Sequence, residues 1–251
     1  MRSEDRALFE GGNVFKGPKG EPATSRIARE NVVPTVQWLE QLTGLNLQDN
    51  MLGSTGRSET SGDLDLGVDS TKVSKDVLIN QLLKRGINKD DIKKSGDAVH
   101  LKTPILGDSN NGYVQTDFMF SDNPTLQHFA LMGGADSSQF KGVHRAILLA
   151  SIAKAQNMKW SPKFGLMDRA TNDVISTDPK EIAIKLLGQG HTPKDLTSVE
   201  SIIKAVKDRP EFEQLVADAK ENFERENLVL PESSPLPGTG AWYRQFVNRR
   251  I

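Results

Sequence analysis

The first half of the chain alternates between helical and strand-like spacing of its apolar residues. A helix is expected after a cap at Thr24 or Ser25, kinked or restarted by Pro34 and stopped by Gly44. Its apolar positions, at roughly helical spacing, are Ile27, Val32, Val33, Val36, Leu39 and Leu42. Strands are predicted at 63–68, 98–102 and 113–120, and an amphipathic helix at 74–85. This order predicts an α/β (α+β) fold with a mixed sheet and flanking helices.

From Ser137 onward the apolar spacing becomes mainly helical. A first helix is expected to place Phe140, Val143, Ile147, Leu148 and Ile152 on one face, and further helices are predicted at 179–187, 198–206 and 210–225. Segments 159–166 and 173–177 are predicted as a short pair of strands. The expected domain organisation is a flexible Gly- and Pro-rich arm at 1–23, an α/β unit at 24–128, a mostly helical unit at 129–230 and a C-terminal tail at 231–251.

The composition excludes several classes of protein. The chain has 251 residues, 36% hydrophobic and 26% charged, which is enough for one large or two small globular units. It has no cysteine, so disulfides and thiolate chemistry are excluded. No apolar run of about eighteen residues is present, so no membrane span is expected. The first six residues, MRSEDR, are charged with no apolar core behind them, so no secretory signal is expected and the protein is predicted to be soluble and cytoplasmic. A net charge of −1 argues against bulk electrostatic capture of nucleic acid.

One segment, GSTGRSETSGDLDLGVD at 53–69, joins a turn of small residues to two carboxylates. Alternate residues of a strand point to the same side, so Asp63 and Asp65 are expected to project together while Leu64 and Leu66 pack beneath them. Two carboxylates on one face repel each other unless a cation lies between them. Hard oxygen ligands of this kind suit Mg²⁺ or Mn²⁺, which in turn neutralise the phosphates of a nucleotide.

A third carboxylate, Asp117, lies among mostly apolar residues of the predicted strand 113–120, where an isolated charge is costly to bury. If that strand lies beside the one with Asp63 and Asp65, the three carboxylates converge. They can then seat two divalent ions that bridge a triphosphate and an attacking hydroxyl, whose proton Asp117 could accept. The structural alternative is that these are ordinary turn and edge-strand aspartates. The favoured prediction is in-line nucleotidyl transfer, with the three aspartates catalytic and metal-binding.

This segment resembles the Gly-Ser plus Asp-x-Asp signature of the DNA polymerase β-like nucleotidyltransferase superfamily, and its TSGDLD core is most similar to the family X DNA polymerases. The run from Phe129 to Gly188 is similar to the family X segment in which a Thr-Gly-Ser turn leads to Phe-Asn, to Arg-Ala on a helix and to a Thr-x-x-Glu helix ending in Leu-Gly. The resemblance covers roughly residues 51–188. It implies a palm that carries the metal ions, followed by a smaller nucleotide-selecting subdomain.

The resemblance also implies nucleotide-binding roles for residues outside the carboxylates. Backbone N–H groups of a Gly-Ser turn can approach phosphate oxygens, and an arginine adds a charge-assisted contact. The residues predicted to bind the nucleotide are Gly53, Ser54, Arg57, Gly62, Gly133, Gly134, Lys141 and Arg145. The chain departs from the family in a loop one residue shorter before Asp63, in Gly133-Gly134 and in Lys141, where the family has asparagine. The alternative for Lys141 and Arg145 is the wet face of an amphipathic helix.

Three functions follow from these residues. The first is transfer of a nucleoside monophosphate from an NTP or dNTP to a hydroxyl, with release of pyrophosphate and a nucleic-acid 3′ end, of DNA or RNA, as acceptor. The second is a minimal nucleotidyltransferase that modifies tRNA, a protein side chain or a small molecule. It is favoured by the near-neutral charge and because about fifty residues precede the signature, with no evident counterpart of the family's lyase and DNA-binding modules. The third is a non-catalytic binding or assembly protein that keeps the fold.

The histidines are expected to have structural or surface roles. They show no paired spacing typical of a metal site. These residues are His100, His128, His144 and His191.

Overall fold

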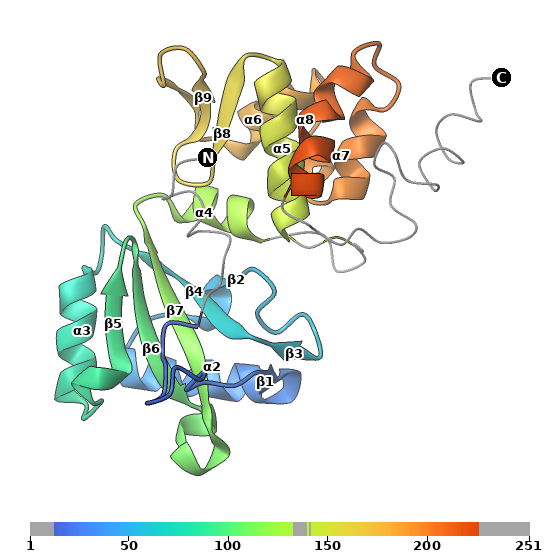
Figure 1. The fold of residues 1–251 in the computed structure, drawn as a ribbon. Helices are drawn as coiled ribbons and strands as arrows, with labels where there is room; N and C mark the ends of the chain where they lie inside the picture. Colours follow the sequence, from blue (N-terminus) through green and yellow to red (C-terminus); the bar gives the residue numbers. More distant parts are fainter. Residues whose placement is uncertain (1–12, 133–139, 141, 226–251) are drawn as a thin grey trace. The chain divides into compact units, whose positions relative to one another are not determined.

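A computed structural model describes residues 13–132, 140 and 142–225 (Figure 1). The chain divides into two units, Met1–His128 and Phe129–Ile251. Helices and strands occur in both units, so the predicted mixed fold class is confirmed. Over the described ranges, no helix is long and apolar enough to cross a membrane.

The first unit is built on a five-stranded sheet with the strand order β2-β4-β7-β6-β5. The parallel pair in its interior is β4 (Asp63–Asp69) with β7 (Tyr113–Ser121). The antiparallel strands are β2 (Met51–Leu52), β6 (Ala98–Pro104) and β5 (Ile92–Ser95). A separate two-stranded ladder pairs β1 (Ile27–Ala28) with β3 (Thr60–Ser61). The main sheet is therefore mixed, as the sequence predicts.

One face of this sheet packs against α2 (Arg29–Thr43) and α3 (Lys75–Lys84), the helix predicted at 74–85 (Figure 1). Alternate residues of β4 turn into that layer, because Leu64 and Leu66 are fully buried whereas Asp63 and Asp65 are only half-buried. Burying one leucine side chain contributes about 1.5–3 kcal/mol. A slip of one residue would expose both leucines, so the hydrophobic layer fixes the face on which the carboxylates lie.

The helix expected to begin at a cap at 24–25 begins at Arg29 instead. Residues Ile27–Ala28 are extended and pair with β3, so the helix cannot start before them. Pro34 lies inside α2 without ending it. Gly44 ends the helix as predicted, with a left-handed φ of 71° and its N–H bonded to a carbonyl of the last turn.

Residues 13–23, here called the N-terminal hook, are packed on the first unit rather than forming part of the flexible arm predicted for 1–23. Phe15 is only 3% exposed, and the Lys93 ammonium lies 5.2 Å from the centroid of its ring. The Gly- and Pro-rich composition misled the prediction, because a single buried aromatic side chain can anchor a segment without regular structure. Residues 1–12 lie outside the described part of the chain.

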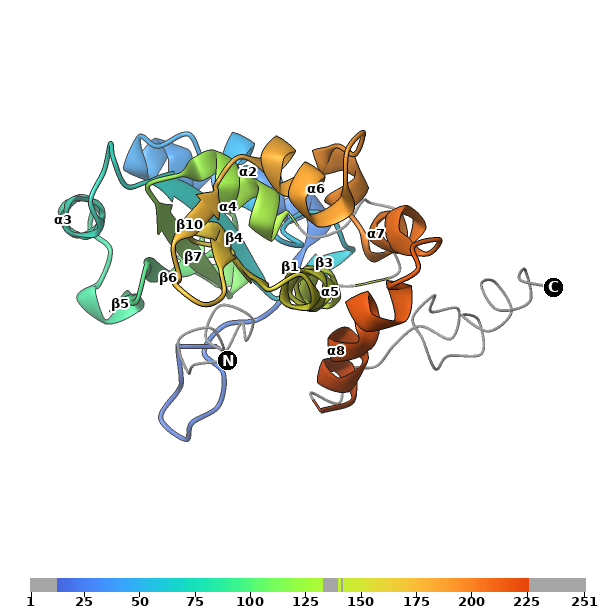
Figure 2. The same ribbon diagram turned by 90° about the horizontal axis from the view of Figure 1, so that it is seen from above.

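The second unit is mostly helical, as predicted, and is arranged around α5 (Gly142–Ala155), in which nine of fourteen residues are buried. This helix lies beside α8 (Phe212–Arg225) in both views (Figure 1, Figure 2). The strand predicted at 159–166 is instead a hairpin, because Gly165 adopts a φ of +75° and begins a new strand. The other elements are α4 (Pro124–Leu131), which crosses the boundary, β8 (Met158–Ser161), β9 (Gly165–Asp168), β10 (Val174–Ser176), α6 (Pro179–Leu187) and α7 (Val199–Val206). The predicted tail at 231–251 lies outside the described residues.

Candidate active site

The three predicted aspartates converge on the sheet face opposite α2 and α3. In the parallel pairing of β4 with β7, Asp65 lies directly opposite Asp117, and Asp63 is two residues earlier on the same side. Each of the three offers a carboxylate oxygen, and these oxygens all lie within 4.8 Å of one another. The expected convergence is therefore present, and it depends on two strands that are separated by more than forty residues in sequence.

The carboxylates of this cluster disfavour one another's charge. Burial, followed by the charges of Asp63 and Asp117, raises the pKa of Asp65 from 3.8 to about 8. Burial and then Asp117 also raise the pKa of Asp63, against the opposing effect of the nearby Arg26 guanidinium. A divalent cation would relieve this repulsion, and three carboxylate oxygens form the hard donor set that Mg²⁺ and Mn²⁺ prefer. The residues present therefore fit such a cation.

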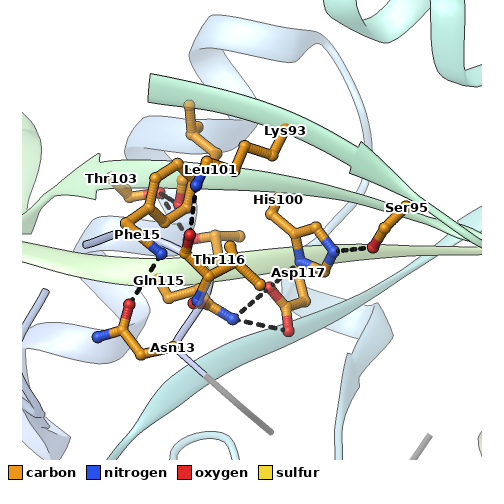
Figure 3. Close-up of polar contacts among 11 residues, drawn as sticks. Asn13, Phe15, Lys93, Ser95, His100, Leu101, Thr103, Gln115, Thr116 and Asp117 are labelled. Carbon is orange, nitrogen blue, oxygen red and sulfur yellow. Dashed lines mark hydrogen bonds and ion pairs between the residues drawn. The ribbon is translucent and has the colours of Figure 1, made fainter. Parts of the chain in front are cut away.

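Asp117 is hydrogen-bonded by side chains from two strands, His100 on β6 and Gln115 on β7 (Figure 3). The Nδ1 atom of His100, on β6, lies 2.7 Å from its Oδ1. The side-chain amide of Gln115 donates to Oδ1 over 3.0 Å and to Oδ2 over 3.2 Å. On the far side of the imidazole, the Ser95 hydroxyl lies 2.6 Å from Nε2.

His100 was expected to have only a structural or surface role, and no sequence motif marks it. Its position becomes informative only through the antiparallel register of β6 with β7, in which His100 lies opposite Asp117. Both strands are predictable from their apolar alternation, whereas their register is not. The sequence signal that could have indicated this residue is a histidine between two apolar strand residues, Val99 and Leu101.

The Gly-Ser turn lies directly against the carboxylates. Gly53 has a φ of +60°, and a Cβ atom there would lie 3.0 Å from Oδ2 of Asp65. The Thr55 hydroxyl oxygen accepts from the backbone N–H of Asp65 over 2.9 Å, which ties the turn to β4. Ser54, between Gly53 and Thr55, is exposed. The turn is thus placed where its backbone and the Ser54 hydroxyl can meet a phosphate bound at the cluster.

Two arginines that sequence reasoning missed hold the loop between this turn and β4. Arg29 donates to the Ser58 carbonyl over 3.0 Å, and also to the carbonyl of Arg57. Arg26 donates to the Thr60 hydroxyl over 2.9 Å and to the Thr60 carbonyl over 3.1 Å.

The two remaining predicted residues of this loop are placed by these arginines. A Cβ at Gly62 would lie 3.1 Å from Nη1 of Arg26, so a glycine lets that guanidinium approach the strand. Arg57 is partly exposed, and its carbonyl is one of the acceptors of Arg29. The loop is therefore held from outside by side chains that precede it in sequence.

Arg145 does not have the nucleotide-binding role expected of it. Its side chain is buried and donates to three backbone carbonyls, those of Phe129, Ala130 and Leu196. Burial lowers the pKa of Arg145 to about 10. Arg145 is a structural residue of the second unit, which also corrects the alternative of a wet helix face.

The other predicted pocket residues, Gly133, Gly134 and Lys141, lie outside the described residues.

No protein-family model matches this chain, and no curated protein sequence matches it either.

Proposed function

We propose that this protein is a metal-dependent nucleotidyltransferase, which moves a nucleoside monophosphate from an NTP or dNTP to a hydroxyl acceptor and releases pyrophosphate. The observation that carries the proposal is the convergence of three carboxylate oxygens within 4.8 Å beside a Gly-Ser turn. Asp63 and Asp65 would hold the cation that binds the triphosphate, and Asp117 would join them for a second cation. Bound Mg²⁺ or Mn²⁺ supplies neutralisation of phosphate charge and acidification of the acceptor hydroxyl.

The protein's own residues bind and orient the reactants. The turn at Gly53-Ser54 would receive the triphosphate, and Asp117 would accept the proton of the acceptor hydroxyl. A bond then forms between the acceptor oxygen and the α-phosphorus, and the bond from that phosphorus to pyrophosphate breaks. The likeness to family X polymerases supports a DNA or RNA 3′ end as the acceptor.

A second candidate differs only in the acceptor, which would be tRNA, a protein side chain or a small molecule. It is favoured by the net charge of −1 and by the burial of Arg145, which removes one cation expected to face nucleic acid. A non-catalytic protein that merely keeps the fold is disfavoured, because loss of function removes any reason to retain three mutually repelling carboxylates.

The test is transfer of label from α-³²P-labelled triphosphates, with Mg²⁺ or Mn²⁺, to primed DNA, single-stranded RNA, tRNA and the protein itself in parallel. Asp63→Asn and Asp117→Asn should abolish transfer. The matched control is Asp69→Asn, a half-buried carboxylate of the same strand outside the cluster, which should transfer at the wild-type rate. Transfer by Asp117→Asn at the wild-type rate would refute the mechanism. Label on tRNA or on the protein alone would refute the polymerase-like form and establish the second candidate.

A further inference from the structure

The hydrogen bonds around Asp117 leave one of its oxygens largely free. A carboxylate has about four lone-pair sites, two on each oxygen. Oδ1 accepts from both His100 and Gln115, which occupies its two sites. Among the residues that the structure describes, Oδ2 accepts only the longer bond from Gln115, at 3.2 Å. One oxygen is therefore held by N–H donors while the other can serve a cation together with Asp63 and Asp65.

The donor and the acceptor of each hydrogen bond from Asp117 through His100 to Ser95 can be assigned in turn. An ionised carboxylate only accepts hydrogen bonds, so Nδ1 of His100 must donate to Asp117. In the neutral ring Nε2 then accepts, and its donor is the Ser95 hydroxyl at 2.6 Å. His100 is 8% exposed and is bonded at both ring nitrogens, which fixes the plane of its ring.

Gln115 is fixed in the same way from the other side. Its Oε1 accepts from the backbone N–H of Val14 over 2.9 Å, so its NH₂ group must face Asp117. Val14 belongs to the N-terminal hook, whose backbone carbonyl at the same residue accepts from Lys93. The orientation of the amide therefore depends on a segment about one hundred residues earlier in the chain.

We propose that His100 and Gln115 are positioning residues, which hold Asp117 with Oδ2 toward the cation, and that the N-terminal hook is part of this arrangement. The inference rests on the metal site of the proposed function. Groups that hydrogen-bond a metal ligand orient it, and their loss typically weakens metal affinity by about 10–100-fold.

The order Ser95, His100, Asp117 is also that of the nucleophile, base and acid of a hydrolase. In such a triad the carboxylate orients the histidine and stabilises its charged form. Here Asp117 also accepts from Gln115 and lies within 4.8 Å of two further carboxylates, so orientation of a metal ligand accounts for more of its contacts.

The test is Mn²⁺ affinity of the full-length protein, measured from the electron paramagnetic resonance signal of free Mn²⁺. His100→Leu removes the donor and should weaken binding by about 10–100-fold, whereas His100→Asn keeps an N–H near the position of Nδ1 and should restore affinity to within about threefold. Gln115→Met keeps the length of the side chain without its amide, and its Mn²⁺ affinity should be as weak as that of His100→Leu. Exposed residues provide the matched controls His128→Leu and Gln37→Met, which should bind as the wild type does.

Two results would overturn the proposal: wild-type affinity in His100→Leu, or affinity in His100→Asn as weak as in His100→Leu. The second readout needs no variant. In the wild-type protein at pH 8, ¹⁵N chemical shifts of the imidazole should show a protonated Nδ1, and a protonated Nε2 with bare Nδ1 would also overturn it. Mn²⁺ binding that depends on Asp117, without transfer of label to any acceptor, would remove the proposed reaction and leave the positioning role standing.

Discussion

Replacing Asp65 by asparagine should stabilise the metal-free protein at alkaline pH and leave its stability unchanged at acidic pH. The substitution keeps the shape of a half-buried side chain and removes its charge. Burial and the charges of Asp63 and Asp117 raise the pKa of Asp65 from 3.8 to about 8. Because the pKa of Asp65 is higher in the folded protein than in the unfolded chain, the folded protein binds this proton more tightly. The stability that protonated Asp65 contributes to the folded protein is therefore fully present below pH 3.8 and is lost as the pH rises to about 8.

The size of the effect follows from the same shift. One pKa unit corresponds to about 1.4 kcal/mol, so about 6 kcal/mol is an upper limit for Asp65. The three carboxylates share protons as a coupled set, and side chains and water relax around a buried charge. We therefore expect about a third of that limit, roughly 2 kcal/mol at pH 8.5, which raises the Tm by about 4–8 °C.

The assay is thermal unfolding in EDTA at pH 4.5, 6.5 and 8.5, for the wild type, Asp65→Asn and the control Asp69→Asn. Two hydrogen bonds from Thr71, through its hydroxyl and its N–H, lower the pKa of Asp69, so the control should not stabilise at any pH. Added Mg²⁺ or Mn²⁺ should raise the Tm of the wild type at pH 8.5 more than that of Asp65→Asn. The electrostatic reasoning would be refuted if the Tm of Asp65→Asn at pH 8.5 is no higher than that of the wild type. It would also be refuted if the gain in Tm is as large at pH 4.5 as at pH 8.5.

Two further predictions concern backbone contacts. Gly53→Ala should weaken Mn²⁺ binding and destabilise by about 1–2 kcal/mol, because its φ is +60° and the new Cβ would lie 3.0 Å from Asp65 Oδ2. Gly86→Ala is the control for urea denaturation and for Mn²⁺ binding, with a φ of +87° and open space around it. Equal Mn²⁺ affinity in both variants would show that the close approach of Gly53 to Asp65 has no role in metal binding. Arg145→Met should destabilise by about 3 kcal/mol in the same assay by leaving three carbonyls without their donor, and a loss under about 0.5 kcal/mol would contradict its structural role.

The aspartate cluster was predictable because each strand carries its own constraint. In β4 the buried leucines, Leu64 and Leu66, can occupy only the face that packs on helices, which sends Asp63 and Asp65 to the other face. Asp117 follows by the same alternation in β7. What the sequence left conditional was whether the two strands are neighbours, and that is set by the sheet order rather than by any local pattern.

The residues around the cluster were not predictable in the same way. His100 contributes through the register between two strands, and the N-terminal hook contributes through one buried side chain, Phe15, in a segment whose composition indicates disorder. Arg145 was expected to bind the nucleotide because it matches an arginine of the family X segment, with the wet face of a helix as the alternative. The α5 helix is buried around most of its circumference, and backbone carbonyls accept the hydrogen bonds of Arg145 that water would otherwise accept.

The features that cost this protein stability fall into two kinds. Arg145 is a buried charge, but its cost is offset locally by three carbonyl acceptors, so nothing further is needed to explain it. The aspartate cluster is different, because the hydrogen bonds to Asp117 orient one carboxylate without removing the burial and the carboxylate repulsion that raise the pKa of Asp65 to about 8. A positive ion in the cluster is the one component that would offset all of these terms together, which is why the unfavourable local chemistry supports a metal site.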